Sequence, residues 1–340
     1  CSSDLCVATI AELPQDIDAA MIGLAASGIR DAVIACGERR IATAVVFAAG
    51  FAEVGPTGQA AQSAMVEAAR EAGVALCGPN CIGYMNLKTG AALSFDVLAA
   101  KRADERPGVG IVAQSGAMQT SLRLALLAKD VNLTYSISTG NEADLGAEDF
   151  LAVLVDDPKT RVIVMFAEQL RHPAAFLELA ARARAAHKPI VLMHPGRSAR
   201  AQASALSHTG SLTGDHAVMR TLVAREGVVM VETLEELVDT SEILLRFPVA
   251  PERGNAIITN SGAFKSYAID FCDSIGLELS ELDPRTLAAA REFLPSFAAM
   301  ENPLDTTAQS IKDPSILGKS LSVLLADENV GSVIAAVIQI

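Results

Sequence analysis

Short apolar runs alternate with longer amphipathic segments along almost the whole chain. Runs of about four to eight apolar residues are typical of buried strands, whereas apolar residues spaced three and four apart indicate helices. Strands separated by helices predict parallel sheets with helices on both faces, the α/β class. Because three such series follow one another, the sequence predicts three consecutive doubly wound units.

The first predicted unit, residues 1–100, is Rossmann-like. A unit of this kind normally carries a G-x-G-x-x-G turn after its first strand, and the sequence has none here. We therefore expect the amino-terminal part of this unit to be missing. The expected strands are Leu5–Ile10, Asp31–Cys36, Ala42–Ala48 and Val74–Cys77, and the expected helices are Ile17–Ser27 and Gln59–Ala72.

The second predicted unit, residues 108–247, follows the polar linker Lys101–Gly108. Its regular alternation of strands and helices is typical of a flavodoxin-like domain. The expected strands are Val109–Ala113, Thr134–Ser138, Val162–Phe166, Pro189–Met193 and Val228–Val231. The expected helices are Ala117–Ala128, Ala147–Val155, Pro173–Ala186, Asp215–Arg225 and Leu234–Leu245.

The third predicted unit, residues 254–340, is also flavodoxin-like and opens in the same way as the second. Gln114-Ser115-Gly116-Ala117 recurs as Asn260-Ser261-Gly262-Ala263, each time after a predicted strand. The chain begins without Met and stops inside the apolar run Val333–Ile340, which resembles a buried strand. We therefore expect a truncated third unit in a piece of a longer polypeptide. The expected elements are the strand Ala256–Thr259 and helices ending at Ser274, Phe293 and Ala326.

Composition narrows the possible partners. The chain has 340 residues, 51% of them hydrophobic, and a formal net charge of −13. A nucleic-acid surface or an anionic membrane surface requires clustered Lys and Arg, so neither partner is expected. The apolar runs are shorter than the roughly 20 residues of a transmembrane helix, and no basic-then-apolar leader is present. We expect a soluble, cytoplasmic protein that acts on a small molecule or on another protein.

The cysteine pattern predicts no metal site. Six cysteines are spread over the chain, and none is paired with His at the spacing of a zinc site. Cys77 and Cys81 flank a Gly-Pro-Asn turn, but their C-x3-C spacing differs from the C-x2-C of thiol oxidoreductases. We interpret all six as reduced thiols of a cytoplasmic protein.

The Gln114–Ala117 segment is a candidate anion site. It joins a predicted strand to a predicted helix, where free backbone N–H groups and the positive end of the helix dipole meet. Gly116 would let the backbone approach a phosphate, and Ser115 would add a hydroxyl donor. The alternative is a serine N-cap followed by a packing glycine, and the sequence leaves both open.

His208 is the candidate nucleophile. It lies in the small-residue loop Ser207-His208-Thr209-Gly210, ahead of a predicted helix. An imidazole attacks through one nitrogen when the other is held protonated, which a carboxylate does well. Glu168 follows a buried strand at the ligand-binding edge of the sheet and is the expected partner, with a solvated glutamate as the alternative. Three acidic residues of a neighbouring loop are expected to be solvated or to cap a helix: Glu142, Asp144 and Asp149.

The remaining histidines and two arginines have simpler interpretations. His194 ends a predicted strand, and we expect a packed or capping role for it. His172, His187 and His216 lie at predicted helix ends and carry no predicted chemistry. Arg197 and Arg200 flank the His208 loop, where they would either balance a phosphate or lie on the surface.

Several motifs, taken in order, resemble a known family. Gly78-Pro79-Asn80-Cys81-Ile82-Gly83, Gln114–Ala117, Ser138-Thr139-Gly140-Asn141-Glu142-Ala143-Asp144 and Ser207–Ser211 follow one another as in NDP-forming acyl-CoA synthetases, relatives of the succinyl-CoA synthetase α subunit. Asn302-Pro303-Leu304-Asp305 resembles that family's third-domain signature. The resemblance implies a CoA-binding domain, a succinyl-CoA-ligase-like flavodoxin domain and a ligase-CoA domain.

The resemblance also implies a reaction. Such enzymes make acyl-CoA from a carboxylic acid, CoA and ATP through an acyl phosphate and a phosphohistidine, and they release ADP and phosphate. His208 would be the phosphohistidine and Glu168 the carboxylate that orients it. Ser115 and Gly116 would cradle phosphate, with Ser207, Thr209 and Gly210 of the loop in the same binding set. Gly78, Pro79 and Asn80 would lie beside the CoA thiol.

The nucleotide site is expected elsewhere. No ATP-grasp module, which would hold ATP or ADP with Mg²⁺, lies within the 340 residues. We expect it on a fused domain or on a separate subunit, in a homo- or hetero-oligomer. The run Leu192–Ser198 resembles the branch that includes feruloyl-CoA synthetases. The alternatives are a regulatory CoA-binding module, the synthetase-like part of a protein acetyltransferase, and a ligand-binding protein without phosphoryl chemistry.

Overall fold

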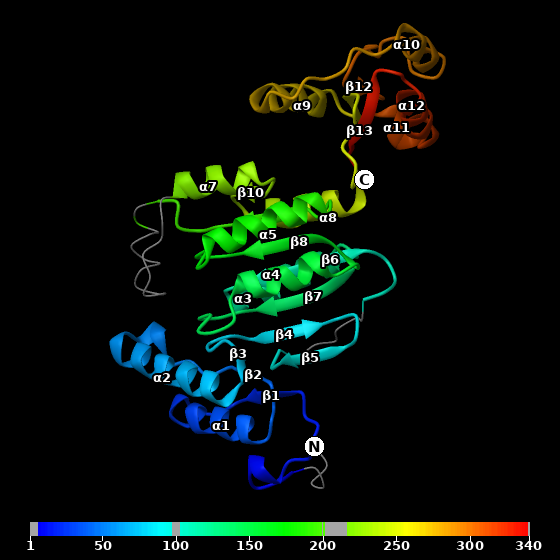
Figure 1. Cartoon of the computed structure of the whole chain (residues 1–340). Helices are drawn as coiled ribbons and strands as arrows, with labels where there is room; N and C mark the ends of the chain where they lie inside the picture. The colour runs from blue at the N-terminus through cyan, green and yellow to red at the C-terminus, as the bar shows by residue number, and fades with distance from the viewer. Residues whose placement is uncertain (1–5, 97–102, 199, 201–215, 339–340) are drawn as a thin grey trace. The chain divides into compact units, whose positions relative to one another are not determined.

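The computed structural model describes residues 6–96, 103–198, 200 and 216–338. The chain forms two compact units, Cys1–Pro248 and Val249–Ile340 (Figure 1). Each unit consists of parallel-dominated sheets covered by helices, so the predicted α/β class is confirmed. Within the described residues, no helix is both long and apolar enough to cross a membrane.

A three-stranded parallel sheet, in the order β1-β2-β3, begins the first unit. Helix α1 buries Ile29, Val33 and Cys36 against it, at the spacing of one helix face. Helix α2 begins with Pro56 and ends before Gly73, whose left-handed backbone is a common helix stop. The elements are β1 (Ala19–Ile22), α1 (Ala26–Glu38), β2 (Thr43–Val46), α2 (Pro56–Ala72) and β3 (Ala75–Cys77), with short 3-10 turns at Ile10–Glu12 and Ala52–Val54.

Three predicted elements of this region are wrong. The described residues of Leu5–Ile10 form no strand, and β1 lies within the segment predicted as the helix Ile17–Ser27. The predicted strand Asp31–Cys36 lies inside α1. Alanine and short apolar residues fit both element types, so the local pattern could not separate a buried helix face from a buried strand.

The larger sheet of the first unit has seven strands in the order β10-β9-β8-β6-β7-β4-β5. The five strands from β6 to β10 are parallel and follow the 2-1-3-4-5 order of flavodoxin-like sheets, as predicted. Their bounds are β6 (Gly108–Ala113), β7 (Leu133–Ser138), β8 (Thr160–Phe166), β9 (Ile190–Met193) and β10 (Val229–Val231).

The other two strands form a hairpin that the sequence did not indicate. β4 (Gly83–Asn86) pairs antiparallel with both β5 (Ala91–Ser94) and β7. The sequence placed these residues in the predicted unit 1–100, but in the structure they belong to the same sheet as the strands of the predicted unit 108–247. The predicted boundary near residue 100 therefore does not separate two sheets.

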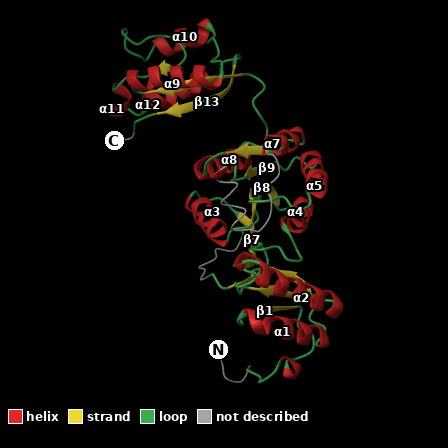
Figure 2. Ribbon diagram, turned by 90° about the vertical axis from the view of Figure 1, so that its left-hand side faces the viewer, coloured by secondary structure: helices red, strands yellow, loops and turns green. Residues whose placement is uncertain are grey.

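Helices cover both faces of the seven-stranded sheet (Figure 2). One apolar layer packs α4 and α5 against the sheet, and the other packs α3 and α8. Strands such as β6 are buried at every position because they meet a helix on each side. The helices are α3 (Gly116–Ala128), α4 (Ala147–Asp156), α5 (Pro173–Ala185), α7 (His216–Arg225) and α8 (Leu234–Arg246).

The second unit contains a three-stranded parallel sheet in the order β12-β11-β13. It begins with a strand, an amide residue and a helix, like the large sheet of the first unit. Asn302 braces it, because its side-chain amide donates to the carbonyls of Asn255 and Ser280 at 2.9 Å each. The elements are β11 (Gly254–Thr259), α9 (Gly262–Ile275), α10 (Pro284–Arg291), β12 (Leu304–Asp305), α11 (Gln309–Lys312), α12 (Ser315–Leu325) and β13 (Val330–Ala336).

Candidate functional site

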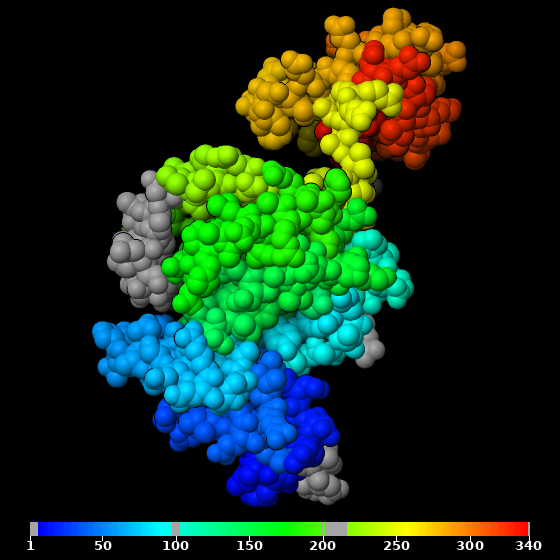
Figure 3. Space-filling view, viewed as in Figure 1, coloured from blue at the N-terminus to red at the C-terminus, as the bar shows by residue number. Residues whose placement is uncertain are grey.

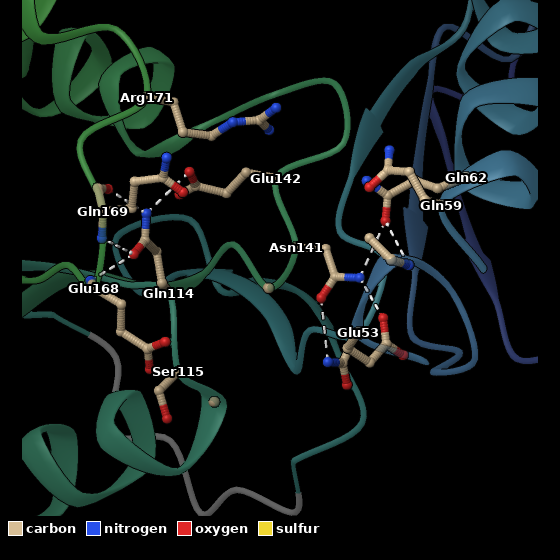
Figure 4. A pocket seen from close by; sticks show the side chains of 14 residues that line it. Glu53, Gln59, Gln62, Gln114, Ser115, Asn141, Glu142, Glu168, Gln169 and Arg171 are labelled. Carbon is tan, nitrogen blue, oxygen red and sulfur yellow. Dashed lines mark hydrogen bonds between the residues drawn. The ribbon is translucent and has the colours of Figure 1, made fainter. Parts of the chain in front are cut away.

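The loops that follow β6, β7 and β8 meet at the carboxyl edge of the large sheet. In an open α/β sheet this edge, next to the point where the strand order reverses, is where ligands bind. Together with residues around α2 these loops enclose a cleft of about 310 Å³, here termed the edge cleft (Figure 4). It is lined by Ala52, Glu53, Gln59, Gln62, Asn80, Gln114, Ser115, Gly116, Gly140, Asn141, Glu142, Glu168, Gln169 and Arg171.

Gln114 connects the three loops. Its Oε1 accepts hydrogen bonds from the backbone N–H groups of Glu168 and Gln169, at 2.6 and 3.0 Å. Its Nε2 donates to the carbonyl of Gln169 at 2.7 Å and to Glu142 Oε2 at 3.0 Å. The amide therefore fixes the backbone on which Glu168 is mounted.

Glu142 is a buried carboxylate with three donors. It is 1% exposed. Its Oε1 accepts from Thr139 Oγ1 at 2.7 Å and from the backbone N–H of Ala147 at 2.9 Å. Burial raises the pKa of Glu142 to about 7, and the charge of Glu148 adds to this. The hydrogen bonds from Thr139 and Gln114 and the charge of Arg171 act in the opposite direction.

The opposite wall of the edge cleft is built from amide and carboxylate side chains. Asn141 Nδ2 donates to Glu53 Oε2 at 2.6 Å and to Gln62 Oε1 at 3.1 Å, and Asn80 Nδ2 donates to Asn141 Oδ1 at 3.2 Å. Burial raises the pKa of Glu53, but the hydrogen bonds from Asn141 and nearby backbone N–H groups outweigh it and lower the pKa overall. In Figure 3 the surface of α2 (light blue), the helix that contains Gln62, borders the surface of the large-sheet region (green).

Two glycines allow the loop after β3 to approach the large sheet. A Cβ on Gly116 would lie 2.5 Å from Ile82 Cγ1, and one on Gly140 would lie 2.2 Å from the carbonyl oxygen of Pro79. Side chains at either position would push the Pro79–Ile82 segment away from the cleft.

The structure brings most of the predicted site residues together. Glu168, Ser115, Gly116 and Asn80 line the edge cleft. In Figure 4 the Glu168 carboxylate extends toward Ser115, whose hydroxyl points away from it. Gly78 and Pro79 are attached through their backbone: their carbonyls accept from the N–H groups of Ala143 and Asn141, both at 2.9 Å.

Four predicted site residues cannot be placed. They lie outside the described residues: Ser207, His208, Thr209 and Gly210.

Of the two interpretations of the Gln114–Ala117 segment, the structure shows the serine N-cap with a packing glycine. Ser115 caps α3, because its Oγ accepts from the N–H of Met118 at 3.4 Å, and Gly116 packs against Ile82. The N–H groups of Met118 and Gln119 donate to Ser115, so the anion site, which stays a prediction, would use those of Gly116 and Ala117.

The acidic residues of the loop after β7 follow the prediction in part. Asp149 caps α4 by accepting from the N–H of Gly146 at 2.8 Å, and Glu142 also caps it through Ala147. Glu142 is not solvated, however, and Asp144 instead accepts from the N–H of Leu76 at 3.0 Å.

The other candidates have structural roles. The ring of His194 contacts that of His216 edge-on, with centroids 5.6 Å apart, and burial followed by the His216 charge lowers the pKa of His194. Arg197 forms an ion pair with Glu232 at 2.6 Å. His172 precedes α5 and donates its backbone N–H to Glu148 at 3.0 Å.

Sequence reasoning missed several lining residues. Gln114 and Asn141 were part of the quoted motifs, yet no role was predicted for them. The signal was available for these two, because both follow strands whose carboxyl ends form the ligand edge: Gln114 follows β6 directly, and Asn141 follows the last residue of β7 by three positions. Nothing in the sequence marked Glu53 or Gln62, which reach the cleft from a distant segment, or Arg171, which lies on the same loop as Glu168.

Comparison with known proteins assigns the chain to a family. Residues 106–244 match the model of the succinyl-CoA ligase like flavodoxin domain, and residues 2–86 match that of a CoA binding domain. The α subunit of acetate–CoA ligase (ADP-forming) II from Pyrococcus furiosus is 30% identical over 96% of this chain and 70% of its own length. The chain belongs to the ADP-forming acyl-CoA synthetase family.

Two further relatives of this synthetase-family chain refine the comparison. Trans-feruloyl-CoA synthase FCS1 from an unknown prokaryotic organism is 42% identical over 97% of the chain and 47% of its own length. The solved structure of dinucleotide-forming acetyl-coenzyme A synthetase 1 from Ca. Korarchaeum cryptofilum, in complex with phosphate and ADP, is 26% identical, with a TM-score of 0.86 over 98% of this chain and 71% of that one. Several curated relatives are about twice as long as the part that this chain spans.

Proposed function

We propose that the chain is the CoA- and acyl-handling part of an ADP-forming acyl-CoA synthetase, with His208 as the phosphoryl carrier. The observation that carries the proposal is the edge cleft. Glu168, Ser115, Gly116 and Asn80, which come from distant parts of the sequence, line one cavity in a chain of this family.

The proposed reaction has two group-transfer steps on this chain. First, a carboxylate oxygen of the acid attacks the phosphorus carried by His208, the P–N bond breaks, and an acyl phosphate and free imidazole result. Next, the CoA thiolate attacks the carbonyl carbon, the C–O bond to phosphate breaks, and acyl-CoA and inorganic phosphate form. A carboxylate alone is a poor electrophile, so the phosphoryl group supplies the leaving group that CoA displaces.

The cleft residues fit these roles. Glu168 would hold one nitrogen of His208 protonated so that the other accepts the phosphoryl group. Ser115, Gly116 and the N–H groups at the start of α3 would bind phosphate oxygens, and Arg171 adds positive charge to the lining. Gly78, Pro79 and Asn80 would lie next to the thiol end of CoA. Ser207, Thr209 and Gly210 would complete the phosphate-binding set.

The nucleotide would be handled elsewhere. We propose that an ATP-grasp module, fused or on a separate subunit of an oligomer, binds ATP with Mg²⁺, phosphorylates His208 and releases ADP. The length of the relatives supports this division. We also propose a cytoplasmic location, because the buried thiols of Cys36, Cys77, Cys81 and Cys272 are free, as is usual in a reducing compartment.

The substrate is proposed to be an aromatic propenoic acid of the ferulate type, because the relative at 42% identity is a trans-feruloyl-CoA synthase. Thioester formation from ferulate and from acetate, with CoA, ATP, Mg²⁺ and the ATP-grasp module present, tests both parts of the proposal. We expect feruloyl-CoA to form faster than acetyl-CoA and the His208→Ala variant to form neither. CoA binding without turnover of any acid would instead support a regulatory CoA-binding module.

A further inference from the structure

Gln114 and Glu142 form a hydrogen-bonded chain behind Glu168, and neither has a role in the reaction steps above. We infer that they are positioning residues: Glu142 fixes the Gln114 amide, and Gln114 fixes the Glu168–Gln169 backbone so that the Glu168 carboxylate faces its partner. The inference rests on the proposed role of Glu168 and deepens it.

The four hydrogen bonds of Gln114 allow one orientation of its amide. The oxygen faces two backbone N–H groups, and the nitrogen faces a carbonyl and a carboxylate. A flipped amide would place donors against donors and acceptors against acceptors. Because the backbone of Glu168 is held at its N–H and that of Gln169 at both its N–H and its carbonyl, the turn cannot shift without breaking the set.

The second unit provides an internal comparison. Asn260 follows β11 as Gln114 follows β6, and each amide holds the segment after a parallel neighbouring strand. Asn260 donates to the carbonyl of Ile338 at 3.1 Å and accepts from its N–H at 2.9 Å. An amide therefore holds the end of a neighbouring strand in both units, and the hydrogen bond to a buried carboxylate distinguishes Gln114.

Burying the Glu142 carboxylate carries a desolvation cost, and a helix cap does not need a buried charge. Glu142 has φ of +53°, a left-handed backbone that is uncommon outside glycine. The charged groups that act on it are Glu148 and Arg171, and the Cys77 thiol is also affected by it. Glu148 is 5% exposed, and its Oε2 has no hydrogen-bond partner among the described residues. Capping of α4 accounts for only one of the three hydrogen bonds of Glu142, the one from Ala147; the other two come from Thr139 and Gln114.

The substitution Gln114→Glu tests the inference with little change of shape. It replaces the Nε2 donor with an oxygen that faces Glu142 Oε2 and the carbonyl of Gln169. We expect kcat for thioester formation to fall about 10- to 100-fold with a smaller change in the KM for CoA, as for other residues that orient a reactive group. The remaining activity should be relatively higher at pH 6 than at pH 8, because protonation of either carboxylate restores a donor.

A second substitution is expected to rescue the first. In the double variant Gln114→Glu with Glu142→Gln, the new amide at 142 can donate to the new carboxylate at 114. We expect kcat of the double variant to be at least about fivefold higher than that of Gln114→Glu alone. Such a gain indicates direct coupling between the two residues. The matched control is Asp149→Asn, which changes a carboxylate that caps the same helix without touching Gln114. It should leave kcat and its pH profile unchanged.

Hydrogen exchange separates this inference from the proposed function. The amides of Glu168 and Gln169 should exchange faster in Gln114→Glu than in the wild-type chain, whether or not any acid is turned over. A wild-type protein that forms no thioester would refute the proposed function. The exchange rates would still show whether Gln114 holds the Glu168–Gln169 backbone. The inference would be overturned if Gln114→Glu left amide exchange and kcat unchanged. It would also be overturned if Asp149→Asn lowered kcat as much as Gln114→Glu does. If Gln114→Glu does not fold, the single variant Glu142→Gln is judged by the same two measurements.

Discussion

The side-chain amide of Asn141 donates a hydrogen bond of 2.6 Å to Glu53 Oε2. Asn141 follows β7 of the large sheet, whereas Glu53 lies in the 3-10 turn ahead of α2. This bond and its neighbour to Gln62 join the loop after β7 to the segment around α2 within one wall of the edge cleft. The shape of that wall therefore depends on the protonation and donor pattern of three side chains.

Asn141→Asp should weaken this junction in a pH-dependent way. The new carboxylate would face Glu53 Oε2 and Gln62 Oε1 without a donor between them. We expect the free energy of unfolding of the first unit to fall by about 1–3 kcal/mol at pH 8 and to recover partly near pH 5, where one carboxylate is protonated. Chemical denaturation at the two pH values checks this. The control Asn141→Ala adds no charge and should show a much smaller pH dependence; equal behaviour of the two variants would contradict the account.

Gly116→Ala should force Ile82 away from the start of α3. Because the new Cβ would lie 2.5 Å from Ile82 Cγ1, we expect a loss of about 1–3 kcal/mol in the free energy of unfolding. In the double variant with Ile82→Ala the two losses should not add, since the clash is gone. Gly318→Ala is the matched control: it lies within α12 with no atom within 4 Å of the new Cβ, and should stabilise the chain by roughly 0.5–1 kcal/mol. Additive losses in the double variant would count against the contact.

Glu142 should make stability depend on pH between about 5 and 7. Burial raises its pKa from 4.5 to about 7, so the native state binds this proton more tightly than the unfolded state does. The stabilisation is therefore present at the acid end and is lost as pH rises toward 7, by up to roughly 1.4 kcal/mol per pH unit. In the Glu142→Gln variant the side chain at this position does not titrate. Denaturation curves should show the stability of the wild-type chain falling relative to the variant over that range, whereas parallel pH profiles would show that Glu142 does not titrate there.

The sequence was informative where strands are buried on both faces. β6, β8 and β9 appear as separate apolar runs because helices cover each side of the sheet, so their order along the chain could be predicted. Around α1 and β1 the alanine-rich sequence fits helix and strand equally well. The β4–β5 hairpin was missed because its short strands depend on pairing with the distant β7, which no local pattern records.

The candidate site divides in a similar way. Glu168, Ser115 and Gly116 were predicted because they follow apolar strands, and strand ends of a parallel sheet share an edge. The burial of Glu142 was not predictable, since it arises from packing against Gln114, Thr139 and the start of α4. Glu53 and Gln62 reach the cleft only through the tertiary contact with Asn141.

The most direct test of the central claim, that His208 carries a phosphoryl group, needs no nucleotide. The chain is incubated with ³²P-labelled inorganic phosphate and the acyl-CoA whose acid gives the fastest thioester formation. Reversal of the two steps on this chain should leave an acid-labile, base-stable label on the wild-type protein and none on His208→Ala. A label that persists in His208→Ala, or a folded wild-type chain that acquires none, would contradict the account.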